Sequence, residues 1–165
     1  MMVARDAATL GTLLRHVIEL LDGAVEEAYA RAGLAYRPRY TPVVRALLAL
    51  GPASIRAISR HAGITHSAAS QTVAQMARRG LVRLRPGGDG RERIVALTSK
   101  ARAMAPALRR QWAATNRAAS RLETELRAPL SEVLRETIRA LERRPFAARI
   151  EQAGRAEARR ARGGK

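Results

Sequence analysis

The spacing of apolar residues predicts a helix at the start of the chain. From Leu10 to Ala28, apolar residues recur every three or four positions, the pattern of an amphipathic helix. Gly33 offers a C-terminal stop, and the Pro-containing segment 36–41 predicts a linker. A second, short helix is expected over Pro42–Leu50, because proline suits a first helical position and Gly51-Pro52 ends the run.

The next two helices are short and are joined by a glycine. Ser54 is expected to cap a helix over Ile55–Ala62, and Thr65 a helix over His66–Arg79. Two helices that cross near a right angle need a sterically unrestricted residue in their turn, and Gly63 supplies it. This segment therefore predicts a helix-turn-helix. The alternative is an ordinary helical hairpin with a polar outer face.

After residue 80 the period changes from helical to alternating. Leu81–Arg85 and Arg91–Leu97 are β-rich runs on either side of the Gly-rich loop 86–90, which predicts a hairpin. A hairpin directly after a helix-turn-helix occupies the place of a wing. The loop lacks both a GxGxxG pattern and a GK[ST] ending, so it does not match a phosphate-cradling loop.

A long helix with a regular apolar stripe follows, capped by Thr98. Its stripe has heptad spacing and predicts a packing seam for a helix of a second copy; the stripe comprises Ala101, Ala105, Leu108, Trp112, Thr115, Ala119, Leu122 and Leu126. A last helix opens at Pro129 and Ser131. Ala153–Lys165 contains no large apolar residue, and we expect a frayed or disordered basic tail there.

The predicted fold is mainly α with a small β-hairpin wing, an α+β winged helix-turn-helix whose N- and C-terminal helices form a dimerisation region. The expected parts are an N-terminal dimerisation helix (1–36), the winged helix-turn-helix (37–98), C-terminal dimerisation helices (99–150) and the basic tail (151–165).

Charge points to a polyanionic partner. The chain has 165 residues, with 31 Lys and Arg against 14 Asp and Glu, a net charge of +17. A uniform compositional bias toward arginine would spread this excess evenly. Instead, residues 37–110 hold 15 basic residues and only two acidic ones, Asp89 and Glu92. A positive field confined to one region favours nucleic acid.

The predicted DNA contacts lie on the second helix of the motif and on the wing. Short and amide side chains there can contact base edges in a major groove, and arginine at a wing suits the negative minor groove. The recognition-helix candidates are Thr65, His66, Ser67, Ala68, Ser70, Gln71, Gln75 and Arg78, and the wing candidates are Arg85, Asp89, Arg91 and Arg93. Thr41 is a candidate for the DNA backbone. For any single wing arginine, a solvated basic turn is the alternative.

In this order of elements the chain resembles the MarR (multiple antibiotic resistance regulator) family of transcriptional regulators. Besides the helix order, the resemblance rests on Gly80-Leu81-Val82, on residues 89–93 at the wing and on residues 95–98 before the long helix. It covers residues 8–150 and is most specific over 54–104. It implies a homodimer that binds a pseudo-palindromic operator in double-stranded DNA, usually as a repressor relieved by a small ligand or an oxidant. Ser59 and His66 depart from the usual residues at their positions.

The resemblance also implies a ligand pocket between the dimerisation helices and the winged domain. Because aromatic residues are only 3% of the chain, the candidates are its rings and their neighbours: His16, Tyr36, Tyr40, Arg45 and Trp112. The alternative, that the tyrosines and Trp112 are core or interface residues, is favoured.

Other classes of function lack support in the sequence. The chain has no cysteine, which excludes disulfides, thiolate metal sites and a thiol switch. No catalytic constellation, metal motif or cofactor motif stands out, so we expect neither an enzyme nor a cofactor. Without a signal pattern or a membrane span, a cytoplasmic location is expected. The alternative function is a basic nucleic-acid-binding or nucleoid-associated protein without sequence preference.

Overall fold

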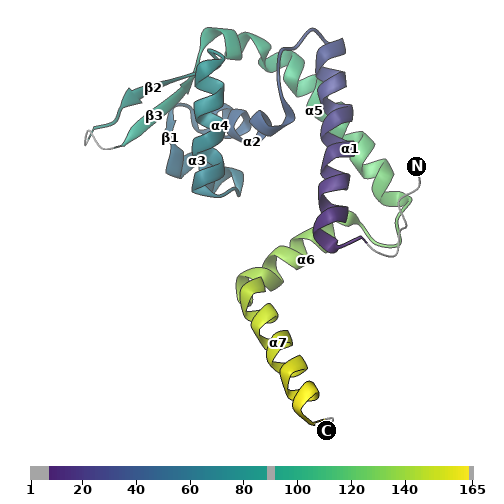
Figure 1. Cartoon of the computed structure of the whole chain (residues 1–165). Helices are drawn as coiled ribbons and strands as arrows, with labels where there is room; N and C mark the ends of the chain where they lie inside the picture. The colour runs from purple at the N-terminus through teal and green to yellow at the C-terminus, as the bar shows by residue number, and fades with distance from the viewer. Residues whose placement is uncertain (1–7, 89–91, 164–165) are drawn as a thin grey trace. The chain divides into compact units, whose positions relative to one another are not determined.

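The computed structural model describes residues 8–88 and 92–163. Its elements, in chain order (Figure 1), are α1 (Leu10–Arg31), a 3-10 turn η2 (Pro38–Tyr40), α2 (Thr41–Leu50), β1 (Ala53–Ser54), α3 (Ile55–Ala62), α4 (His66–Arg78), β2 (Val82–Pro86), β3 (Arg93–Leu97), α5 (Ser99–Thr124), α6 (Leu130–Arg143) and α7 (Phe146–Gly163). The mainly helical fold with a small wing hairpin is confirmed.

The helix-turn-helix forms through the predicted caps. The Ser54 hydroxyl accepts a hydrogen bond from the Ala57 amide at 3.3 Å, and the Thr65 hydroxyl accepts one from the Ala68 amide at 3.2 Å. Each cap satisfies an amide that the first turn of a helix leaves unpaired. Gly63 joins α3 to α4 at φ 65°, a left-handed conformation that side chains with a Cβ rarely adopt.

The wing belongs to a three-stranded antiparallel sheet of order β1-β3-β2. β2 pairs with β3 from Val82 opposite Leu97 to Pro86 opposite Arg93, and the Gly87 amide donates to the Glu92 carbonyl at 2.7 Å. A Cβ at Gly87 would lie 2.9 Å from that carbonyl oxygen, so this close approach requires glycine. The sequence did not predict β1, because two residues carry no alternating pattern.

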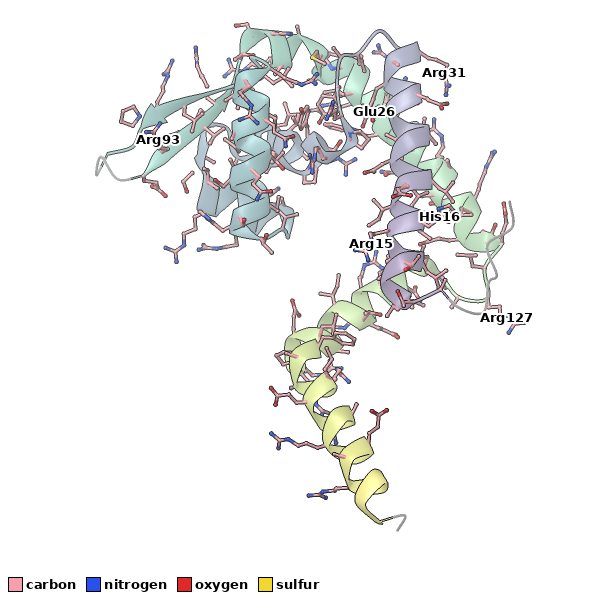
Figure 2. The ribbon with its side chains drawn as sticks, in the orientation of Figure 1. Arg15, His16, Glu26, Arg31, Arg93 and Arg127 are labelled. Carbon is pink, nitrogen blue, oxygen red and sulfur yellow. The ribbon has the colours of Figure 1, made fainter. Side chains whose placement is uncertain are left out.

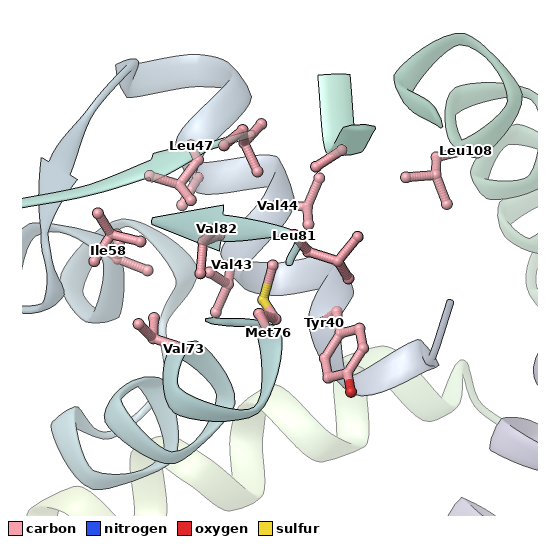
Figure 3. Close-up of a cluster of buried hydrophobic side chains, with 14 of the residues drawn as sticks. Tyr40, Val43, Val44, Leu47, Ile58, Val73, Met76, Leu81, Val82 and Leu108 are labelled. Carbon is pink, nitrogen blue, oxygen red and sulfur yellow. The ribbon is translucent and has the colours of Figure 1, made fainter. Parts of the chain in front are cut away.

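One hydrophobic core holds the winged-helix unit, residues 8–115, together (Figure 3). It combines side chains from α2, α3, α4, the sheet and two flanking helices. Tyr29 of α1 and Trp112 of α5 are both in this core, so the flanking helices contribute to it as well. The flanking helices and the helix-turn-helix thus share one core, and the predicted boundaries of the parts stay predictions.

The heptad stripe of α5 has two different environments. Its first four members, Ala101, Ala105, Leu108 and Trp112, are buried in the core of their own chain. Leu122, in the last turn of α5, and Leu126, just beyond the helix, are 38% and 43% exposed. The expectation that the whole stripe faces a second copy is therefore wrong for its first half, because that half belongs to the core of its own chain.

The C-terminal unit, residues 116–163, has no buried side chain among those that the structure describes. The Ser131 amide at the start of α6 donates to a Glu123 carboxylate oxygen at 2.8 Å, and this hydrogen bond lowers the pKa of Glu123. α7 continues to Gly163, where the sequence predicted a frayed or disordered tail. Alanine and arginine favour helix even without an apolar face, which accounts for the difference. Across the described ranges, no helix is long and apolar enough to span a membrane.

Candidate nucleic-acid interface

The outer face of α4 presents the predicted recognition side chains. Val73 and Met76 are buried and fix the inner face of the helix. On the opposite face the predicted residues are exposed: Thr65, His66, Ser67, Ala68, Gln71 and Arg78. The caps at Ser54 and Thr65 and the turn at Gly63 set the position of this face relative to α3.

Two of the predicted recognition residues are less exposed than the others and therefore less available for contact with DNA. Ser70 is half-buried. Gln75 is also half-buried, and its side-chain oxygen accepts a hydrogen bond from Nη1 of Arg39 at 3.3 Å. Because that bond orients its amide, Gln75 is a poorer candidate for base contact than Gln71, which lies one turn earlier.

The wing hairpin carries arginines on both of its strands. Arg83 and Arg85 are exposed on β2 and Arg93 is exposed on β3, where Figure 2 labels it. Val82 and Leu84 alternate with them and turn inward, as expected for a strand with one solvated face. The predicted wing residues Asp89 and Arg91 lie outside the described residues.

Arginines that the sequence analysis did not single out add to this positive surface. They are Arg37, Arg39, Arg79 and Arg83, all exposed. Arg83 could have been found from the alternation of β2, where it lies between Val82 and Leu84. For the other three, the only signal was the excess of basic residues over 37–110, because their positions depend on the packing of η2 against α4.

Thr41 faces tyrosines of its own chain. Its hydroxyl lies 3.3 Å from the Tyr29 hydroxyl, and it accepts a hydrogen bond from the Tyr36 hydroxyl at 3.5 Å. Burial raises the pKa of Tyr36 far above its ordinary value, so this phenol remains a neutral donor. The contact of Thr41 with DNA stays a prediction.

Four of the five ligand-pocket candidates belong to one group of side chains that contact one another directly or through Tyr29. Tyr36 and Tyr40 are buried with ring centroids 5.7 Å apart, and Tyr36 meets Tyr29 at 5.0 Å, both edge to face. Trp112 is buried and bonded to Tyr29, and the Arg45 guanidinium lies 4.8 Å from the Trp112 ring centroid. Tyr36, Tyr40 and Trp112 are therefore part of the core, and their contact with a ligand stays a prediction. His16 is exposed on α1 (Figure 2) beside Glu19.

A surface hollow of about 270 Å³ lies next to Trp112. Arg45, Leu48 and Ala49 of α2 and Arg109 and Trp112 of α5 line it. It combines two guanidinium groups with an indole and aliphatic walls. Within the described ranges, no three His, Asp or Glu side chains come together as metal ligands would.

Comparison with known proteins gives a consistent result. Residues 36–92 match the model of the MarR family. No curated protein matches the chain.

Solved structures match over most of their own length. A MarR family transcriptional regulator from Silicibacter pomeroyi is 27% identical, with a TM-score of 0.55 over 82% of this chain and 96% of that one. The Streptomyces coelicolor regulator PcaV, solved with its natural ligand, is 23% identical, with a TM-score of 0.58 over 87% and 99%. The M. tuberculosis regulator MosR, solved with DNA, is 19% identical, with a TM-score of 0.59 over 90% and 98%.

The family match falls on the linker, the helix-turn-helix and the start of the wing, the same segment that carries the exposed face of α4. The structural matches extend the likeness to the flanking helices. Residues 36–92 of the chain therefore resemble the MarR family, and the chain has the winged helix fold of solved MarR-family regulators.

Proposed function

We propose that this protein is a homodimeric transcriptional repressor that binds a pseudo-palindromic operator in double-stranded DNA. The observation that carries the proposal is the exposed polar face of α4 beside a wing with three exposed arginines. A helix of this kind fits the major groove, where amide and hydroxyl groups distinguish base pairs. MosR, which has the same fold, was solved with DNA.

In this proposal the exposed residues divide into two roles. Ser67, Ala68 and Gln71 face base edges, with His66, Ser70 and Gln75 at the margin of the contact. Thr65, Thr41 and Arg78 hold phosphates, which position the protein without specifying sequence. Arg85 and Arg93 place the wing at the minor groove, together with Asp89 and Arg91 of the loop.

Assembly into a dimer is supported by apolar side chains that the chain leaves uncovered. On α1, Leu13, Leu14 and Leu21 are 41–51% exposed. The C-terminal unit adds Leu122, Leu126, Val133, Leu134, Ile138 and Leu141, all between 38% and 55% exposed. An apolar surface of this extent usually marks an interface. A two-fold dimer would present two recognition helices to the two halves of one operator.

Relief by a small ligand is supported by the hollow at Trp112. Its two guanidinium groups and its indole suit a small anionic molecule with an apolar body. PcaV, which shares the fold, was solved with its natural ligand. The ligand would act by binding better to a conformation that binds DNA poorly.

The deciding experiment is selection of duplexes from a random pool by the full chain, followed by sequencing. We expect enrichment of a single motif with two-fold symmetry, and repression of a reporter that carries it. Equal recovery of all duplexes would contradict the proposal and favour a basic nucleoid-associated protein. That protein would still depend on salt but would have no operator.

A further inference from the structure

A second hollow, of about 240 Å³, lies at the C-terminal end of the recognition helix. It is lined by Arg37 and Tyr40, from the segment that leads into α2, and by Gln75, Arg78 and Arg79 of α4 and its C-terminal cap. Three of these five side chains are arginines. The hydrogen bond from Arg39 to Gln75 ties the two segments together at this place.

The positive charge of this hollow is almost uncompensated. Glu26 of α1 approaches Nε of Arg37, but only to 3.9 Å, and both side chains are about half exposed. Within the described ranges, neither Arg78 nor Arg79 has an acidic partner. Three guanidinium groups that share one hollow repel one another, and a bound anion would relieve that repulsion.

Tyr40 supplies an independent indication of a ligand. Its side chain is only 1% exposed, and among the described residues no hydrogen bond joins its hydroxyl to another group. The hydroxyl oxygen is not fully enclosed, because no fully buried side-chain polar atom of the described residues lacks a partner. The hydroxyls of Tyr29 and Tyr36, in the same aromatic group, both reach Thr41. Figure 3 shows the Tyr40 oxygen turned away from Leu81 and Val44. An O–H group at the wall of a cationic hollow is a ready donor to an anion.

We propose that this hollow binds a phosphate group. Guanidinium groups present forked donors that match phosphate oxygens, and the Tyr40 hydroxyl adds a neutral donor. A water molecule takes up about 30 Å³ of liquid, so the hollow has room for one phosphate and some water. The phosphate belongs either to the DNA backbone, in which case the inference rests on the proposed function, or to a free phosphorylated molecule.

The first test is titration of the full chain with inorganic phosphate at constant ionic strength. We expect binding to weaken about tenfold in Arg79→Ala and to weaken also in Tyr40→Phe, which keeps the ring and its packing. Arg110→Ala is the matched control, because it removes the same charge from an exposed position of α5 that does not line the hollow. It should bind like the wild type.

The second test identifies the source of the phosphate by DNA titration over a range of salt concentrations. If the DNA backbone fills the hollow, Arg79→Ala lowers the salt slope by about 0.9 per protomer relative to Arg110→Ala, and inorganic phosphate competes with DNA. If a free molecule fills it, the slopes agree and phosphate still binds to the DNA complex.

The proposal is overturned if Arg79→Ala and Arg110→Ala behave alike in both tests. That result would leave the proposed function intact, provided that the wild type selects an operator. If the wild type selects no operator but binds phosphate in a way that depends on Arg79, the phosphate site is supported and the proposed function is contradicted.

Discussion

The indole N–H of Trp112 donates a hydrogen bond to the hydroxyl oxygen of Tyr29, with 3.0 Å between the two atoms and 83 residues between them in sequence. Both side chains are buried, so the bond is shielded from water. It joins α5 to the end of α1, and the same tyrosine hydroxyl reaches Thr41 at the start of α2. One buried hydroxyl thus connects three helices of the winged-helix unit.

We expect Tyr29→Phe to lower the free energy of unfolding by about 1–3 kcal/mol, because the buried indole N–H loses its acceptor. Urea denaturation measures the change, with the slope of the transition unaltered. Tyr40→Phe is the matched control, since its hydroxyl has no partner among the described residues. Equal losses in the two variants would show that the Trp112 bond contributes nothing specific.

Gln71 and Gln75 should differ in base readout although both lie on α4. Gln71 is exposed, whereas the amide of Gln75 is held by Arg39. We expect Gln71→Ala to weaken binding by about 1–3 kcal/mol and to relax preference at one base position. Gln75→Ala should leave base preference unchanged. Competition between operators substituted at single positions tests both, and uniform weakening by Gln71→Ala would assign Gln71 to the backbone instead.

The wing arginines should account for more of the specific affinity than arginines of the C-terminal helix. Arg85→Ala and Arg93→Ala remove charge from the hairpin, and Arg159→Ala removes the same charge from the exposed surface of α7. Guanidinium groups in a narrow minor groove gain from its enhanced negative potential. We therefore expect the wing variants to lose more operator affinity at two salt concentrations. Equal losses of affinity in the wing variants and in Arg159→Ala would show that the wing acts only through its charge and does not enter the minor groove.

Self-association should depend on the exposed end of α5 and not on its buried end. Leu122→Arg should give monomers with weak operator binding, as judged by sedimentation, while the free energy of unfolding of the winged-helix unit stays unchanged. Leu108 is only 1% exposed, so Leu108→Ala should destabilise the fold by about 2–5 kcal/mol. A Leu122→Arg variant that remains dimeric would move the interface to another surface.

The sequence predicted the local features of this fold well, because local chemistry determines them. Ser54, Gly63 and Thr65 each specify a cap or a turn, and the structure uses all three as expected. β2 is displaced by one residue from the predicted run Leu81–Arg85, and β3 ends at Leu97 as predicted. The predicted start of the second run, Arg91, lies outside the described residues.

Features that depend on tertiary packing could not be predicted from the sequence. The stripe of α5 has one regular spacing, yet Leu108 is in the core and Leu122 is exposed, a difference set by which elements pack nearby. The hydrogen bond from Arg39 to Gln75 joins residues 36 positions apart and has no sequence signature. The DNA contacts themselves remain predictions that rest on exposure and charge.

The exposure of α1 has a consequence for local unfolding. Every side chain from Leu10 to Ala24 is exposed, and Tyr29 is the one buried residue of this helix. In a single chain, opening these first turns would uncover no buried side chain, so their amides would exchange deuterium sooner than those of α2. If these turns pack against a second copy, the protection of their amides would rise with protein concentration. The exchange rate of the α1 amides would then report the fraction of chains in the dimer.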